Sequence, residues 1–331
     1  MPDLSIGLVF VLLLVLGAEF VNGWTDAPNA IATVVSTRVL SPYQALMMAS
    51  VLNAAGAFYG IKVAETIGKG IVKPEVINLP TIGAAMLSII IWSTLAWWRG
   101  LPTSESHALV AGLTGAGLAA AGPQVLLWDG WKKVLIGLGF STFLGFGGGL
   151  LLMTLIYRLF FRARPETIRR WFGKLQIVSA SFMAFSHGSN DGQKFIGVFT
   201  LALVLGGFLN EFAIPYWVIL MCAMTMGIGT AVGGWRIVRT MGLRITKLQP
   251  VHGFAAETSA AATIVLASSL GIPLSTTHTI NTTIMGVGAT RRLSAVRWGV
   301  GREIAIAWIL TFPVCMGIAW LVTKVVVTYW K

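Results

Sequence analysis

Charge is what this sequence has least of. Asp, Glu, Lys and Arg make up 11% of its 331 residues, whereas soluble domains carry roughly 25%. Cysteine is scarce as well, and because Cys222 and Cys315 both lie inside apolar runs, neither a disulfide framework nor a cysteine metal site is indicated. The chain also lacks a Gly-Lys-Ser/Thr phosphate loop and a His-Glu-x-x-His motif. These absences argue against an ATPase and a zinc hydrolase.

Long apolar runs are present instead, and 56% of the residues are hydrophobic. A membrane-spanning helix needs about 20 apolar residues, and barrel strands are much shorter. The sequence therefore predicts an all-α polytopic membrane protein with roughly 10–12 membrane segments. The uncharged runs of spanning length are 39–61, 76–98, 134–157, 212–235 and 304–323.

The net charge of +12 raises the alternative of a nucleic-acid partner, but the basic residues lie between apolar runs. Such clustering is typical of cytoplasmic loops, so we expect a lipid bilayer around the chain and no nucleic acid. The run at 4–18 lacks a basic leader and a cleavage site, so we expect a retained first helix. The strongest basic cluster flanks Glu166 and consists of Arg158, Arg162, Arg164, Arg169, Arg170 and Lys174.

The chain contains an internal repeat in three places. FVNGWTDAPNAIA, from Phe20, returns as FSHGSNDGQKFIG, from Phe185, which aligns Asp26 with Asp191. GIKVAETIGKGI returns as GWRIVRTMGLRI, and GLPTSESH returns as GIPLSTTH. Three matches in the same order indicate duplication. We predict two homologous membrane repeats, 1–157 and 175–331, joined by a basic cytoplasmic linker, 158–174.

Each half also contains short or interrupted apolar segments. Paired interruptions at corresponding places in two halves indicate a transporter site, because unwound backbone inside a membrane is tolerated only where protein or water satisfies it. We therefore predict helix breaks at GWTDAPNAIA (23–32), around Asp191, and at Pro102 and Pro273, all facing a binding site.

Asp26 and Asp191 are the candidate cation ligands. Ionisable groups inside a membrane are costly and usually face a cavity, a partner or an ion path, and carboxylates bind hard cations or protons. The alternative is that each aspartate only caps a helix.

Hydroxyl groups cluster after Pro102 and Pro273, where helices are predicted to begin. The first turn of a helix exposes unpaired N–H groups that bind oxyanions, although Ser and Thr are also ordinary N-caps. His107 and His278 are interpreted as packing residues. The predicted anion ligands are Ser104, Ser106, Ser275, Thr276 and Thr277.

Three further charged residues have open roles. Glu65 is either an interfacial charge or a site residue, and so is Glu257. Lys194, which replaces Asn29 in the second half, either neutralises an anion or pairs with Asp191 at i+3. An intramembrane hydrolase using Ser104 and His107 is a weaker alternative, because paired sites favour transport.

These motifs resemble the PiT family of inorganic phosphate transporters. Its G-x-N-D-x-x-N signature is similar to GWTDAPN and GSNDGQK, its S-[GST]-[ST]-H element to SESH and STTH, and its V-x-E-T-x-x-K-G element to VAETIGKG. The likeness covers nearly the whole chain. Thr25, Glu105 and Lys194 depart from the family pattern.

The resemblance implies two inverted-topology repeats, with interrupted helices or re-entrant hairpins at the midplane, that enclose one phosphate and its coupling cations. It places Asp26, Asn29, Asn190 and Asp191 at these sites, with Glu65 and Glu257 as further coupling candidates and Lys194 near the anion. Sodium ions, bound by Asp26 and Asp191, and protons are alternative coupling ions, and no other cofactor is expected. We expect import through a prokaryotic plasma membrane. Sulfate or a metal–phosphate complex as substrate, a passive anion channel, and a homodimer stay open.

Overall fold

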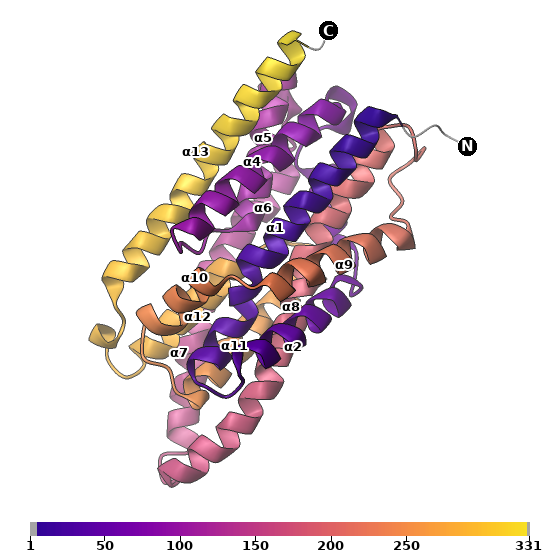
Figure 1. Ribbon diagram of the computed structural model, residues 1–331. Helices are drawn as coiled ribbons and strands as arrows, with labels where there is room; N and C mark the ends of the chain where they lie inside the picture. Colours follow the sequence, from indigo (N-terminus) through magenta and orange to yellow (C-terminus); the bar gives the residue numbers. More distant parts are fainter. Residues whose placement is uncertain (1–4, 330–331) are drawn as a thin grey trace.

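The computed structural model describes residues 5–329, which are almost entirely helical and, within that range, contain no β-strand. This confirms the predicted all-α class. Figure 1 shows the start of α1 and the end of α13 at one end of the molecule and the α7–α8 connection at the other. The helices are α1 (Ile6–Ser36), α2 (Pro42–Ala57), α3 (Lys62–Gly70), α4 (Leu79–Trp98), α5 (Glu105–Ala121), α6 (Trp128–Gly139), α7 (Gly145–Leu159), α8 (Pro165–Leu205), α9 (Tyr216–Val232), α10 (Trp235–Arg239), α11 (Pro250–Ser269), α12 (Thr276–Ala289) and α13 (Trp298–Tyr329).

Four helical stretches in the described chain are long and apolar enough to cross a membrane, and the number rises to six if each of two bent helix pairs counts as one span. The four are Ile6–Ser36, Leu79–Trp98, Trp128–Leu159 and Trp298–Val326. In contrast, α5 and α12 have 17 and 14 residues and are buried along most of their length. At 1.5 Å per residue they are shorter than the roughly 30 Å hydrocarbon core, so they lie inside the bundle as half-spanning helices.

The predicted breaks at Asp26 and Asp191 are wrong. Helix α1 continues through Asp26 and Pro28, and α8 continues for 41 residues through Asp191. Proline removes one helical hydrogen bond, and Gly234 packs against this point. A Cβ there would lie 2.8 Å from Pro28 Cγ and 2.9 Å from the carbonyl oxygen of Trp24. Thr277 and Thr276 at the start of α12 donate to the Asp26 and Asp191 carboxylates, so the backbone has no need to unwind there.

The predicted interruptions near Pro102 and Pro273 are confirmed. Helix α4 ends at Trp98 and α5 begins at Glu105, and α11 ends at Ser269 and α12 begins at Thr276. Gly100 (φ 69°) and Gly271 (φ 67°) turn the chain in the left-handed region, which glycine adopts without steric cost. The matching sequences after Gly60 and Gly234 also form matching bends, of 69° between α2 and α3 and 60° between α9 and α10.

Glycines allow the two halves to interlock. In α1, a Cβ on Gly23 would lie 2.4 Å from the carbonyl oxygen of Met226 in α9. In α8, which corresponds to α1 in the repeat, a Cβ on Gly188 would lie 2.0 Å from the carbonyl oxygen of Asn53 in α2. Small residues at such crossings let helix backbones approach closely in a membrane. The first long helix of each half thus packs against the second helix of the other half.

Hydrogen bonds repeat this exchange. Thr66 Oγ1 donates to the carbonyl oxygen of Gly271 at 2.8 Å, and Thr240 Oγ1 donates to that of Gly100 at 2.8 Å. Each bond ties the bent segment of one half to the α4–α5 or α11–α12 turn of the other half. The two turns are consequently held at the centre, beside α1 and α8.

Candidate functional site

The site is built where the N-termini of α5 and α12 meet. Ser106 Oγ donates to the carbonyl oxygen of Leu274 at 2.9 Å, directly before α12. The rings of His107 and His278 lie edge to face with their centroids 4.5 Å apart, and His278 stacks on Trp308 at 3.6 Å. The two histidines therefore pack the helix starts against each other, although His107 Nδ1 and both ring nitrogens of His278 are buried without a hydrogen-bond partner in the described chain.

Ser104 and Ser275 are the N-caps of these two helices. Ser104 Oγ accepts a hydrogen bond from the backbone N–H of His107 at 3.3 Å, and Ser275 Oγ accepts one from His278 at 3.1 Å. Ser104 and Ser275 are therefore ordinary N-caps, which was the alternative to direct binding of the anion. Helix geometry still leaves the N–H groups of Glu105, Ser106, Thr276 and Thr277 without intrahelical acceptors.

Asp26 and Asn29 lie one turn apart on α1 and face the start of α12. Thr277 Oγ1 donates to the Asp26 carboxylate at 3.2 Å and accepts from Asn29 Nδ2 at 2.9 Å. Asn29 Nδ2 also lies 3.3 Å from Thr276 Oγ1, whereas Asn29 Oδ1 is buried without a hydrogen-bond donor. A buried acceptor without a partner costs about 1–3 kcal/mol. The first half therefore presents a carboxylate and a spare amide oxygen that suit a bound cation.

Asp191 on α8 is already crowded with partners. Its Oδ1 forms an ion pair with Lys194, and its Oδ2 accepts from Thr276 Oγ1 at 2.7 Å. His187 Nε2 lies 3.1 Å from Oδ2. Lys194 thus pairs with Asp191 at i+3, which was one of its two predicted roles.

These groups form one cluster closed to solvent. Ligand atoms of Asp26, His187 and Asp191 all lie within 4.8 Å of one another, and no member of the cluster is more than 3% exposed. The cluster contains three buried carboxylates, those of Asp26, Glu105 and Asp191, and one ammonium group, that of Lys194. Buried charge is very costly unless it is paired. Bound cations or protons would balance the excess. The cluster contains Asp26, Asn29, Glu105, Ser106, His187, Asp191, Lys194, Thr276 and Thr277.

Asn190 and Glu257 lie in the interior beside this cluster. Asn190 Nδ2 donates to Ser268 Oγ at 2.8 Å, and its buried Oδ1 has no donor. Glu257 is buried on α11 and accepts from Thr33 Oγ1 at 2.5 Å and from Gln176 Nε2 at 3.0 Å. Thr33 lies one turn beyond Asn29 on α1, so Glu257 forms a second polar layer next to the cluster. Glu65, by contrast, is exposed on α3, and the structure does not bring it to the site.

Sequence reasoning missed the contacts of Glu105. Its carboxylate accepts from Thr25 Oγ1 at 3.0 Å and from Ser93 Oγ at 2.6 Å, so it faces α1 and α4. Thr25 and Glu105 both depart from the family pattern. Two departures in one sequence could have indicated that these residues contact each other. The contact of His187 with Asp191 was also missed, because a single histidine in an apolar helix is usually interpreted as a packing residue.

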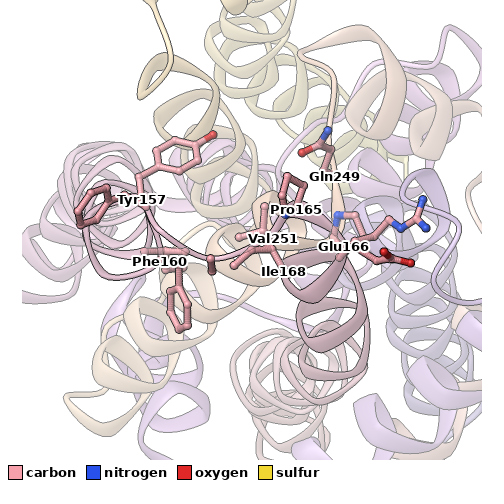
Figure 2. Close-up of a pocket in the computed structure, with 12 residues that line it drawn as sticks. Tyr157, Phe160, Pro165, Glu166, Ile168, Gln249 and Val251 are labelled. Atoms are coloured by element: carbon pink, nitrogen blue, oxygen red, sulfur yellow. The ribbon is translucent and has the colours of Figure 1, made fainter.

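A separate cavity lies at the basic connection. It has a volume of about 590 Å³, and Figure 2 shows its lining residues, which lie where α7 ends and where α8 and α11 begin. Its lining is largely apolar, and Glu166 and Arg169 border it. It belongs to the surface of the protein and not to the buried cluster.

Comparison with known proteins gives three consistent results. Residues 22–319 match the sequence model described as the phosphate transporter family. A probable low-affinity inorganic phosphate transporter of Rhizobium meliloti is 46% identical over 312 residues, which cover 94% of this chain and 92% of that protein. A protein of the same description from Bacillus subtilis is 38% identical over 318 residues, covering 95% of each chain.

One solved structure shares the fold. A chain described as the sodium-dependent phosphate transporter superposes with a TM-score of 0.88 at 24% identity, covering 98% of this chain and 100% of that chain.

Proposed function

Because the chain belongs to the phosphate transporter family, we propose that it imports inorganic phosphate by symport with sodium ions or protons. The membership confirms the resemblance predicted from the duplicated motifs, and it makes the activity transport and not catalysis. The observation that carries the coupling proposal is that the buried Asp26 carboxylate and Asn29, whose Oδ1 has no donor, both contact Thr277. We place this multi-pass protein in the plasma membrane of a prokaryote, since its close relatives are bacterial.

Phosphate is held, in this proposal, by the starts of α5 and α12. Its oxygens accept from the unpaired first-turn N–H groups. They also accept from the hydroxyls of Ser106, Thr276 and Thr277 when these turn away from their acceptors in this structure, which are Leu274, Asp191 and Asp26. Asn190 supplies a further amide. The two helix dipoles favour an anion at this place. Ser104 and Ser275 support the anion indirectly, because they cap and orient the two helices.

Cations make this anion site compatible with the carboxylates around it. A cation between Asp26 and Asn29 lies beside Thr277, so it would attract the phosphate that Thr277 binds. Asp191 lies next to this centre but is paired with Lys194, and Glu257, which accepts from Thr33, offers a position for a proton along α1. Binding of either ion therefore raises the affinity for the other, which is the linkage that symport requires.

The burial of the cluster supports alternating access as the transport mechanism. Since every cluster residue is at most 3% exposed, neither ion can reach its ligands from water without movement of the helices around them. The half-spanning helices α5 and α12 and their glycine turns are the elements that move in this proposal. A passive anion channel would need a continuous path instead.

Uptake of radiolabelled phosphate into proteoliposomes tests the proposal. We expect uptake that depends on an imposed sodium or proton gradient and is competed weakly by sulfate. Efficient competition by sulfate would favour a sulfate permease, and gradient-independent conductance would favour a channel. Empty liposomes and the Asp26→Asn variant are the controls.

A further inference from the structure

Lys194 has an environment that a bound cation would have. Its ammonium group contacts the carboxylate of Asp191, the hydroxyl of Ser106 and, at 3.1 Å, the carbonyl oxygen of Leu274. These oxygens come from α8, the start of α5 and the turn before α12. Carboxylate, hydroxyl and carbonyl oxygens are also the ligands that hard cations select. A lysine has three donors and no acceptor, so these three oxygens use all of its donors.

The equivalent position in the first half is chemically different. Lys194 follows Asp191 by three residues, as Asn29 follows Asp26. Each of these two side chains reaches the first turn of the half-spanning helix from the other repeat, since Asn29 contacts Thr277 and Lys194 contacts Ser106. Asn29, however, leaves a buried oxygen without a partner. Within the described chain, no lysine or arginine forms an ion pair with Asp26.

We propose that the Lys194 ammonium group permanently occupies the second-half cation position, so that a mobile metal cation binds only at the first-half position beside Asp26. The repeat thus provides two related oxygen cages, of which one is filled by a side chain. This inference rests on the proposed function in one respect, namely that the first-half cage binds the coupling ion. Beyond the proposed function, we infer that the coupling ion binds in the first half.

Direct binding of phosphate by Lys194 is the competing role. It would require the ammonium group to release at least one of its three oxygens. Release of Asp191 would leave a buried carboxylate without its counterion, which is strongly unfavourable. The fully satisfied, buried geometry therefore favours a fixed counterion over an anion ligand.

Replacement of Lys194 by the residue of the other repeat tests the proposal. Lys194→Asn removes the tethered charge and leaves Asp191, Ser106 and the carbonyl oxygen of Leu274 to bind a mobile ion. We expect the purified variant to bind one more sodium ion per chain than the wild type in equilibrium dialysis with radioactive sodium. Its thermal unfolding midpoint should fall in choline chloride and recover in sodium chloride at equal ionic strength.

Two further variants complete the test. Asn29→Lys should fill the first-half cage and lower sodium binding by one ion per chain relative to the wild type. Lys132→Asn removes an exposed lysine that pairs with Asp129, and it should bind sodium as the wild type does. Equal sodium binding by Lys194→Asn and the wild type would overturn the proposal.

If Lys194→Asn does not fold, unchanged sodium binding by Asn29→Lys would overturn the proposal instead. These measurements need neither phosphate nor a membrane. A wild type that fails to take up phosphate would refute the proposed function and leave the sodium counts to decide the role of Lys194.

Discussion

The two repeated aspartates have different partners, so their neutralisation should have different effects. Asp26→Asn keeps an oxygen for Thr277 and removes a charge that no lysine or arginine in the described chain balances. We expect normal insertion and thermal stability with loss of cation-coupled uptake. Asp191→Asn leaves Lys194 unpaired, and an uncompensated buried charge costs about 3–5 kcal/mol. The measurement is thermal unfolding in detergent beside phosphate uptake. Equal loss of stability in both variants would contradict this assignment.

The hydroxyl of Thr277 contacts both Asp26 and Asn29. Its removal tests whether it helps to hold phosphate at the starts of α5 and α12. Thr277→Ala should raise the apparent KM for phosphate about tenfold, because an unsatisfied buried partner costs about 1–3 kcal/mol and 1.4 kcal/mol is a factor of ten. Ser269→Ala is the control, since Ser269 is exposed and its hydroxyl bonds only within its own helix. The neighbouring Ser268 is unsuitable as a control because its hydroxyl accepts from Asn190. A KM for Thr277→Ala that matches that of Ser269→Ala would show that Thr277 does not bind phosphate.

Part of this residue-scale chemistry could be predicted from the sequence. The repeat itself singles out Asp26 and Asp191, and the i+3 spacing predicts the Lys194 pair. The partners of Glu105 and Glu257 could not be predicted, because single serines, threonines and glutamines such as Ser93, Thr33 and Gln176 carry no periodic or local signal. Their roles arise from helices that meet only in three dimensions.

At the scale of elements, the close helix crossings limit what glycines can become. A Cβ on Gly188 would lie 2.0 Å from the carbonyl oxygen of Asn53, whereas one on Gly173, also on α8, meets no atom within 4 Å. We expect Gly188→Ala to separate α8 from α2, lower the unfolding midpoint and impair uptake. Gly173→Ala should leave both unchanged or raise stability slightly, by up to about 1 kcal/mol. If the two variants melt alike, the interlocking of the halves does not depend on this crossing.

Hydropathy and turn signals predicted the elements unevenly. A proline two residues after Gly100 and after Gly271 predicted the two interruptions correctly. This was possible because the left-handed turn depends on the glycine itself and not on distant residues. The breaks expected in α1 and α8 were wrong, because polar residues and Pro28 were interpreted without their partners. Thr277 and Thr276 satisfy the two aspartates, and Gly234 makes room at Pro28. Tertiary packing thus keeps helical a segment whose local sequence favours a break.

At the scale of the whole molecule, the basic connection between α7 and α8 should face the cytoplasm. The native cysteines are buried, so a single introduced cysteine reports one position. Thr167→Cys, exposed near the start of α8, should resist an impermeant maleimide added to intact cells. Asp129→Cys, at the opposite end of the Trp128–Leu159 span, should be labelled. The reverse pattern would invert the assigned orientation and place the start of α1 inside.

The division into repeats 1–157 and 175–331 stays a prediction. The exchanged contacts Thr66–Gly271 and Thr240–Gly100 support it, because each half completes the other. We therefore expect neither half to be stable alone. Coexpression of the separate halves should restore a folded complex, which size-exclusion chromatography with both halves tagged would detect. A monodisperse, helical half that survives purification alone would contradict this expectation.

The most direct test of the account is concentrative uptake. Proteoliposomes are prepared with equal phosphate concentrations inside and outside, and an inward sodium or proton gradient is then imposed while the labelled phosphate inside is followed. We expect phosphate to accumulate above its external concentration with the wild type and not with Asp26→Asn. Phosphate that stays equal on both sides whichever cation gradient is applied would contradict coupled transport through this site.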